Sequence, residues 1–293
     1  MPRRWPQPLL FIWILFGQYL SVDDLRCEHI ISGVSSTLAD MTAKSVALVI
    51  GAGAGVGATA AKRFAAGGYH ACLCRRSNQE GLDASVRRIQ NAGGTATGFL
   101  MDVTKPSSIE GLVAMIEKEI GPIEVAVYNL GAQIGNRSLQ ETSHKQFEMG
   151  WKLGTFGLFR FAKALLPAMA ERGSGSLLVT SATSAVRGNE GQHSHAAAMG
   201  GRRMLCQSLN AEYASKGVHI CHIILDGAVD APDTLGKMIG EQKLKEFREQ
   251  GVLMEPTAIA DTYWHLAHQP MSARTFEVDL RNSNDLPWWN SRL

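Results

Sequence analysis

Residues 45–57 read SVALVIGAGAGVG, and this stretch decides the fold. Its first half, Ser45–Ile50, is short, apolar and rich in β-branched residues, which is typical of a parallel strand buried on both faces. A cluster of glycines follows directly, and a helical pattern begins at Val56. Glycines allow a tight turn and a close approach to a pyrophosphate, while the helix N-terminus supplies free N–H groups. The stretch therefore predicts a phosphate-binding turn at the start of an α/β fold.

Short apolar runs alternate with helical stretches along the rest of the chain. We expect strands at 45–50, 70–74, 95–101, 124–128, 176–180, 218–225 and 275–280. We expect helices at 56–66, 78–91, 107–120, 147–172, 194–215, 235–250 and 256–268. This alternation predicts an α/β fold with a doubly wound parallel sheet of about seven strands and helices on both faces. Ligands of such sheets bind at the carboxyl ends of the strands.

Composition narrows the classes of function. A chain of 293 residues could hold one large α/β domain or two small ones, and the absence of a linker or repeat favours a single domain at 41–293. Lysine plus arginine number 29 and aspartate plus glutamate 27, so nothing favours nucleic acid as a partner. The five cysteines show no metal-ligand spacing, and we interpret them as core thiols rather than a disulfide or zinc framework.

Residues 1–40 differ from the rest of the chain. Arg3 and Arg4 precede an apolar run at 9–20, and about 12 residues suit a signal-peptide core better than the roughly 20 needed to span a bilayer. One interpretation is a secretory signal or membrane anchor, which places the protein in the secretory pathway or at the ER membrane. The other is a dispensable extension, with translation from Met41 and a cytoplasmic protein. We exclude residues 1–40 from the fold.

The second expected strand ends in Arg75 and Arg76, where such folds commonly read the adenosine ribose. An acidic residue there favours the unphosphorylated cofactor, whereas guanidinium groups suit a 2′-phosphate. The pair therefore favours NADP(H) over NAD(H). The alternative is a solvated arginine pair on a surface loop.

Several motifs now resemble the short-chain dehydrogenase/reductase family. The spacing Gly51-x-x-x-Gly55-x-Gly57 is similar to the family's glycine motif, and Asp102-Val103 resembles its adenine-contacting pair. Residues 128–131, Tyr-Asn-Leu-Gly, resemble its Asn-Asn-Ala-Gly stretch, with two departures. The resemblance covers residues 45–280 and implies a Rossmann fold with a nicotinamide cofactor. The residues it assigns to the cofactor, together with the arginine pair, are Gly51, Gly55, Val56, Gly57, Arg75, Arg76, Asp102, Val103, Asn129 and Gly131.

The resemblance also implies a catalytic Asn, Ser, Tyr and Lys, and all four are replaced. Alignment on flanking residues places these positions at Gly154, Ala182, His195 and Met199. In the family the tyrosine delivers a proton, the lysine holds the nicotinamide ribose and lowers the tyrosine pKa, and the serine orients the substrate oxygen. Histidine can act as a general acid, since its usual pKa is about 6.5. Methionine has no charge and no strong donor.

Nearby polar residues offer further candidates. Thr183 or Ser184 could stand in for the serine, whereas side-chain alternation along the strand predicts that Ser181 points to the other face. His193 and His195 form a His-x-His pair, but no further ligand is evident beyond Glu190, so we expect no metal.

Three functions remain open. The first is an oxidoreductase acting on a small carbonyl or alcohol substrate, with His195 as proton donor. The second is a catalytically inactive protein that binds NADP(H) as a structural or sensory ligand. The third is a structural partner, because the helices expected at 147–172 and 194–215 commonly form the interface of a homodimer or homotetramer in the family. The charged segment at 230–251 occupies the family's substrate lid and names no substrate.

Overall fold

Seven parallel strands form one sheet in the order β3-β2-β1-β4-β5-β6-β7. The computed structural model describes residues 44–131, 135–287 and 289, which belong to one compact unit. The chain runs outward from β1 to β3, then returns to β4 on the other side of β1. The strand order therefore reverses between β1 and β4, where open α/β sheets bind ligands. The expected doubly wound parallel sheet is confirmed.

The element bounds follow the sequence pattern closely. The strands are β1 Val46–Ile50, β2 His70–Arg75, β3 Thr95–Leu100, β4 Ile123–Tyr128, β5 Gly175–Ala182, β6 Val218–Asp226 and β7 Glu277–Arg281. The α-helices are α2 Val56–Ala66, α3 Gln79–Asn91, α4 Ser108–Glu119, α5 His144–Trp151, α6 Gly157–Arg172, α7 His193–Tyr213, α8 Lys237–Ile239, α9 Glu241–Glu249 and α10 Pro256–Ala267.

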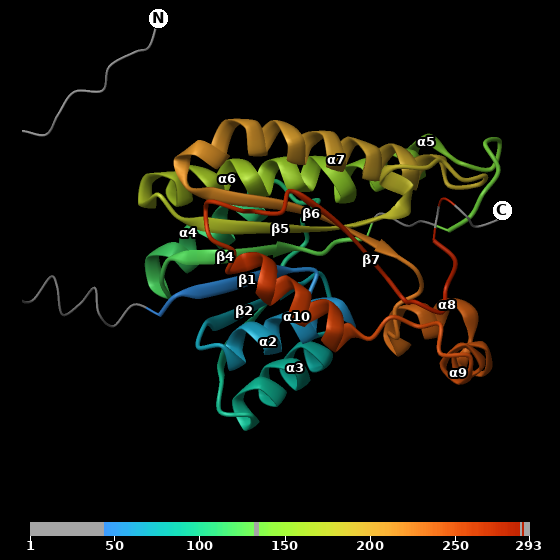
Figure 1. Ribbon diagram of the computed structural model, residues 1–293, viewed down its shortest axis with the longest axis horizontal. Helices are drawn as coiled ribbons and strands as arrows, with labels where there is room; N and C mark the ends of the chain where they lie inside the picture. The colour runs from blue at the N-terminus through green and yellow to red at the C-terminus, as the bar shows by residue number, and fades with distance from the viewer. Residues whose placement is uncertain (1–43, 132–134, 288, 290–293) are drawn as a thin grey trace, which may run out of the picture. The chain divides into compact units, whose positions relative to one another are not determined.

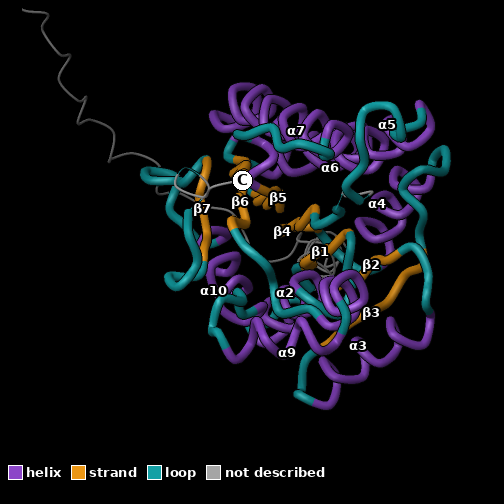
Figure 2. Tube along the Cα trace, turned by 90° about the vertical axis from the view of Figure 1, so that its right-hand side faces the viewer, coloured by secondary structure: helices purple, strands orange, loops and turns teal. Residues whose placement is uncertain are grey.

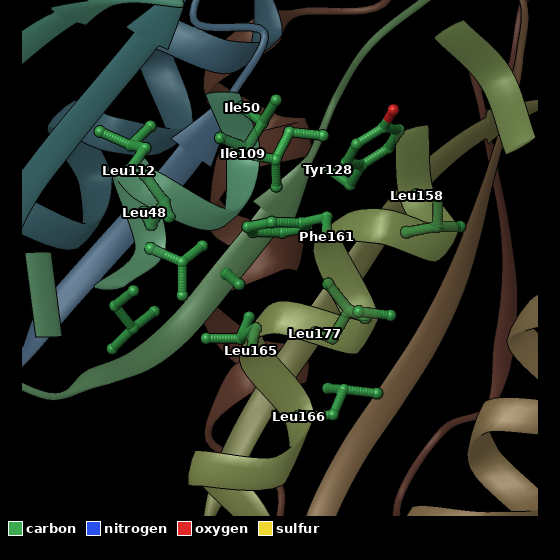
Figure 3. Packing of buried hydrophobic residues seen from close by; sticks show 14 of the residues in the cluster. Leu48, Ile50, Ile109, Leu112, Tyr128, Leu158, Phe161, Leu165, Leu166 and Leu177 are labelled. Carbon is green, nitrogen blue, oxygen red and sulfur yellow. The ribbon is translucent and has the colours of Figure 1, made fainter. Parts of the chain in front are cut away.

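Helices cover both faces of the sheet (Figure 1). The helices α4, α6 and α7 lie on one face, and α2, α3 and α10 on the other, which the end-on view in Figure 2 makes plain. β1 is buried on both faces, as its sequence predicts. Leu48 and Ile50 point into the cluster beneath α4 and α6, where Figure 3 shows them near Phe161. Ala47 and Val49 belong to the cluster beneath α2 and α10. Burying each large apolar side chain contributes roughly 1.5–3 kcal/mol to the free energy of folding.

Two expected helices are interrupted. The helix expected at 147–172 consists of α5, a π-helical turn at Lys152–Phe156 and α6. The Gly154 carbonyl in this turn accepts a hydrogen bond from Arg202, a tertiary contact that periodicity does not reveal. The helix expected at 235–250 is divided at Gly240, whose φ of 85° belongs to the left-handed region. A π turn at Pro232–Gly236 precedes α8.

Four cysteines are buried free thiols, as expected: Cys72, Cys74, Cys206 and Cys221. Burial raises the pKa of each of these thiols to about 12. The interpretations of residues 1–40, including the apolar run at 9–20, fall outside the described residues and stay predictions. Within the described ranges, no helix has the length and apolar character needed to cross a membrane.

Candidate functional site

A cavity of about 300 Å³ lies at the carboxyl ends of β1 to β4, where the strand order reverses. The loops after these strands supply most of its lining: Ile50, Gly51, Gly53, Cys74, Arg75, Arg76, Ser77, Met101, Asp102, Val103, Leu130, Gly131 and Leu153. Six of the ten residues predicted to bind a cofactor are in this set, namely Gly51, Arg75, Arg76, Asp102, Val103 and Gly131.

The glycine loop needs its glycines for close packing. Gly51 has φ of +90°, and a Cβ there would lie 2.8 Å from the Asn129 carbonyl oxygen. A Cβ on Gly57 would collide with the Gly51 carbonyl oxygen. The Asn129 side chain donates a hydrogen bond from Nδ2 to that same oxygen at 3.0 Å. Asn129 and Gly57 therefore shape the loop and do not line the cavity.

The other end of the loop lies close to the segment after β6. A Cβ on Gly55 would lie 2.9 Å from the Ala231 Cβ. Val56 is buried and begins α2 immediately after the loop. The Ala58 N–H already donates to the Gly53 carbonyl at 2.9 Å, so the N–H groups of Val56 and Gly57 are the ones that the start of α2 offers to phosphate oxygens.

Arg75 and Arg76 bring positive charge to the adenosine end of the cavity. Arg75 is half-buried and Arg76 is exposed. The Arg75 guanidinium lies over the first turn of α3, where a Cβ on Gly81 would be 2.8 Å from its Nη1 atom. Asn78 caps α3 by accepting a hydrogen bond from the Gly81 N–H at 2.9 Å. Two guanidinium groups thus lie at the same end of the cavity, which suits an anion.

Asp102 lies opposite this charge, after β3. Its Oδ1 atom accepts hydrogen bonds from the Thr104 N–H at 2.9 Å and from the Thr104 hydroxyl at 2.7 Å. Burial by itself raises the pKa of the Asp102 carboxyl. The Thr104 hydrogen bonds and the positive charges of Arg76 and Lys105 outweigh burial, so the pKa falls below its usual value. Asp102 is therefore a fixed acceptor at the edge of the cavity.

The four positions predicted for catalysis lie on adjoining elements. Gly154 is in the π turn and Ala182 ends β5, while His195 and Met199 lie in the first turns of α7. His195 is 9% exposed and Met199 1%. Ala182 packs against the small buried cluster of Ala198 and Met199. The methionine therefore lies where little solvent reaches it, and it brings no charge to the site.

The prediction that Ser181 points away from this region is wrong. Its hydroxyl lies 3.8 Å from the Met199 sulfur, on the α7 side of the sheet. Thr180 points the other way, toward the Tyr263 hydroxyl at 2.7 Å. Side-chain alternation along β5 therefore directs Ser181 toward α7. Ala182 also contacts α7, because β5 ends there and the chain turns directly into a 3-10 helix. Ser184 is buried and donates to the Gln192 side chain at 3.2 Å.

Sequence reasoning missed Arg202. This side chain is only 1% exposed, and its guanidinium donates to three backbone carbonyls. The acceptors are Gly154 at 2.8 Å, Thr180 at 2.5 Å and Leu130 at 2.8 Å. Burial lowers the pKa of Arg202, but arginine stays charged in proteins. Its spacing of three residues from Met199 and seven from His195 places all three on one helix face, and that spacing was the available signal.

His193 and His195 do not belong to a metal cluster in the part of the chain that the structure describes. No group of three or more His, Cys, Asp or Glu side chains gathers there in a way that could hold a metal ion.

Comparison with known proteins decides the family. A family model for short chain dehydrogenases matches residues 45–238. The chain belongs to the short-chain dehydrogenase/reductase family. This short-chain dehydrogenase is 32% identical over 208 residues to the short-chain reductase protein NovJ of Streptomyces niveus, covering 70% of this chain and 78% of the relative. It is 28% identical over 189 residues to the 3-oxoacyl-[acyl-carrier-protein] reductase FabG of Escherichia coli, covering 64% of this chain and 75% of the relative.

Solved structures give the same fold. A short-chain dehydrogenase from Rhodopseudomonas palustris is 30% identical with a TM-score of 0.69, covering 81% of this chain and 98% of that one. An alcohol dehydrogenase from Thermococcus sibiricus, complexed with 5-hydroxy-NADP, is 25% identical with a TM-score of 0.72, covering 83% of this chain and 98% of that one. The fold class expected from sequence is therefore confirmed for this short-chain dehydrogenase.

Proposed function

We propose that this chain is an NADP(H)-binding oxidoreductase that acts on a carbonyl or alcohol substrate, with His195 as its proton donor. The observation that carries the proposal is the cavity at the carboxyl ends of β1 to β4, between the glycine loop and the two arginines. The glycine loop and the start of α2 suit the pyrophosphate. Asp102 and Val103 suit the adenine, as the sequence resemblance implies.

The arginine pair supports NADP(H) over NAD(H). A 2′-phosphate extending from the adenosine ribose would meet Arg75 and Arg76, whose guanidinium groups favour an anion. Among the described residues that line this cavity, the one acidic side chain is Asp102, which lies after the neighbouring strand β3. The Thermococcus sibiricus relative, complexed with 5-hydroxy-NADP, supports the same cofactor class.

His195 is the residue we assign to proton transfer. It occupies the predicted tyrosine position, in the first turn of α7 and largely shielded from water. Its ring nitrogen does not extend as far as a tyrosine hydroxyl, and a misplacement on the order of 1 Å can cost roughly a hundredfold in rate. The nicotinamide group supplies hydride exchange when it is bound. With Met199 in the predicted lysine position, we expect slow turnover.

A second candidate function is cofactor binding without turnover. Met199 favours it, because this side chain is nearly inaccessible and contacts Ser181 where the family has a charged group. A protein of this kind would hold NADP(H) as a structural or sensory ligand.

One experiment separates these functions. The purified full chain is titrated with NADPH and with NADH while nicotinamide fluorescence is followed, and a panel of carbonyl compounds is then assayed. We expect tighter binding of NADPH, and a turnover that His195→Ala lowers by about 10²–10⁴. His193→Ala, two residues earlier on the same helix, is the matched control and should retain turnover. Binding without any turnover supports the second candidate. No binding by either nucleotide eliminates both.

A further inference from the structure

Arg202 joins three segments of the chain from behind the cavity. Its acceptors are the carbonyls of Leu130 after β4, Gly154 in the π turn and Thr180 in β5. Leu130 also lines the cavity, and so does Leu153, the residue before Gly154. The hydrogen bonds from one buried guanidinium therefore fix the backbone at two places in the cavity wall. A buried arginine with three carbonyl acceptors is costly to disturb, because each carbonyl would lose its partner.

Tyr128 also stabilises the part of the cavity wall that contains Leu153. Its hydroxyl donates to the Leu153 carbonyl at 2.7 Å, and its ring lies 5.3 Å from the Arg202 guanidinium carbon. Figure 3 shows the Tyr128 ring near Phe161, with the hydroxyl directed away from it. Gly157 makes room for this hydroxyl, because a Cβ at that position would collide with it. Tyr128 and Arg202 thus hold Leu153 and Gly154 through consecutive carbonyls.

Four of the departures from the family's sequence pattern lie in or beside this unit. Tyr128 and Leu130 replace two residues of the Asn-Asn-Ala-Gly stretch, and Gly154 stands at the predicted asparagine position. Met199 stands at the predicted lysine position, three residues before Arg202 on α7, which puts their Cβ atoms about 5–6 Å apart. A lysine at 199 would place a second cation beside a buried guanidinium, and like charges in the interior repel strongly. The substitutions are therefore mutually compatible in their packing and charge.

We propose that Arg202 is a positioning residue for the cofactor cavity, with Tyr128 as its partner. Together they fix the wall formed by Leu130 and Leu153. Arg202 also supplies the buried positive charge of α7, in place of a lysine at position 199. The proposal rests on the proposed function only in so far as the cavity holds NADP(H).

The test compares Arg202→Lys with Arg203→Met in the full chain. A lysine keeps the charge but cannot reach three diverging carbonyls, because it lacks the planar fork of arginine. Arg203→Met removes a bidentate ion pair with Glu277 from the next position of the same helix, away from the cavity lining. We expect Arg202→Lys to raise the Kd for NADPH by about tenfold, which corresponds to a loss of about 1.4 kcal/mol of binding free energy. Arg203→Met should leave the Kd unchanged. An unchanged Kd for Arg202→Lys, or an equal rise for both variants, would overturn the proposal.

Hydrogen exchange supplies a readout that needs no cofactor. We expect Arg202→Lys to speed amide exchange in residues 128–131 and 152–156, and Arg203→Met to speed it in β7 instead. Tyr128→Phe serves if Arg202→Lys does not fold, since it removes one hydroxyl and should speed exchange in residues 152–156. Unchanged exchange in 152–156 for the folded variant overturns the positioning role. If the parent chain binds neither NADPH nor NADH, the proposed function fails, and amide exchange still decides whether Arg202, or Tyr128 where that variant is used, positions residues 152–156.

Discussion

Arg75→Ala is expected to weaken NADPH binding about thirtyfold and to leave NADH binding nearly unchanged. Arg75 is half-buried and lies over the first turn of α3, so its guanidinium is held where we propose that the 2′-phosphate binds. A hydrogen bond to a charged group contributes about 1.5–3 kcal/mol. A loss of about 2 kcal/mol corresponds to roughly thirtyfold in Kd. Arg76 is exposed, so Arg76→Ala should cost less, about 0–1 kcal/mol.

Fluorescence titration of each variant with NADPH and NADH measures this difference. Arg87→Ala is the matched control, because Arg87 is an exposed arginine further along α3 and does not line the cavity. The preference is assigned wrongly if Arg75→Ala changes the NADPH Kd less than threefold. It is also wrong if the variant weakens NADH as much as NADPH, since NADH has no 2′-phosphate. Raising the salt concentration should reduce the parent's preference for NADPH, because salt screens the exposed part of this charge.

Two further predictions concern stability and assembly. Burial lowers the pKa of His222 to about 4, although Glu277 partly offsets this. In the unfolded chain His222 binds its proton near pH 6.5, so the free energy of unfolding should fall by up to about 3 kcal/mol as the pH drops from 6.5 to 4. Urea unfolding of His222→Gln should show a shallower fall over this pH range. An equally steep fall would contradict the assignment of the effect to His222. Phe156 in the π turn and Phe159 in α6 are 46% and 45% exposed, and their rings stack with centroids 6.3 Å apart, beside α4. We propose that this face pairs with a second copy of the chain. Light scattering should then give the mass of a dimer or tetramer for the parent and of a monomer for Phe159→Glu. A mass of the variant equal to that of the parent would exclude this face as the interface.

The sequence predicts the sheet and the glycine loop because local signals determine both. Val46–Ile50 is apolar throughout, and the glycines come directly after it. Strict alternation then leaves few arrangements other than a doubly wound sheet. The position of Arg75 at the end of β2 also follows from the chain alone.

Tertiary hydrogen bonds account for what the sequence did not reveal. The π turn at Lys152–Phe156 coincides with the carbonyl that Arg202 binds, and no periodicity marks that contact. Arg202 and Arg203 are neighbours of the same type, yet one is buried on carbonyls and the other pairs with Glu277. Only the helix face separates them, and a pair of arginines ordinarily indicates solvent exposure. The orientation of Ser181 was missed because β5 ends at Ala182 and turns directly into a 3-10 helix, so that both Ser181 and Ala182 contact α7.

Competition between nucleotides tests the central claim most directly. The purified full chain is saturated with NADPH, and 2′,5′-ADP or 5′-AMP is added while the nicotinamide fluorescence is followed. The cavity between the glycine loop and Arg75 predicts that NADPH binds at one site per chain and that 2′,5′-ADP displaces it at lower concentration than 5′-AMP. A folded chain that binds no NADPH, or a bound NADPH that 2′,5′-ADP fails to displace, would contradict the claim.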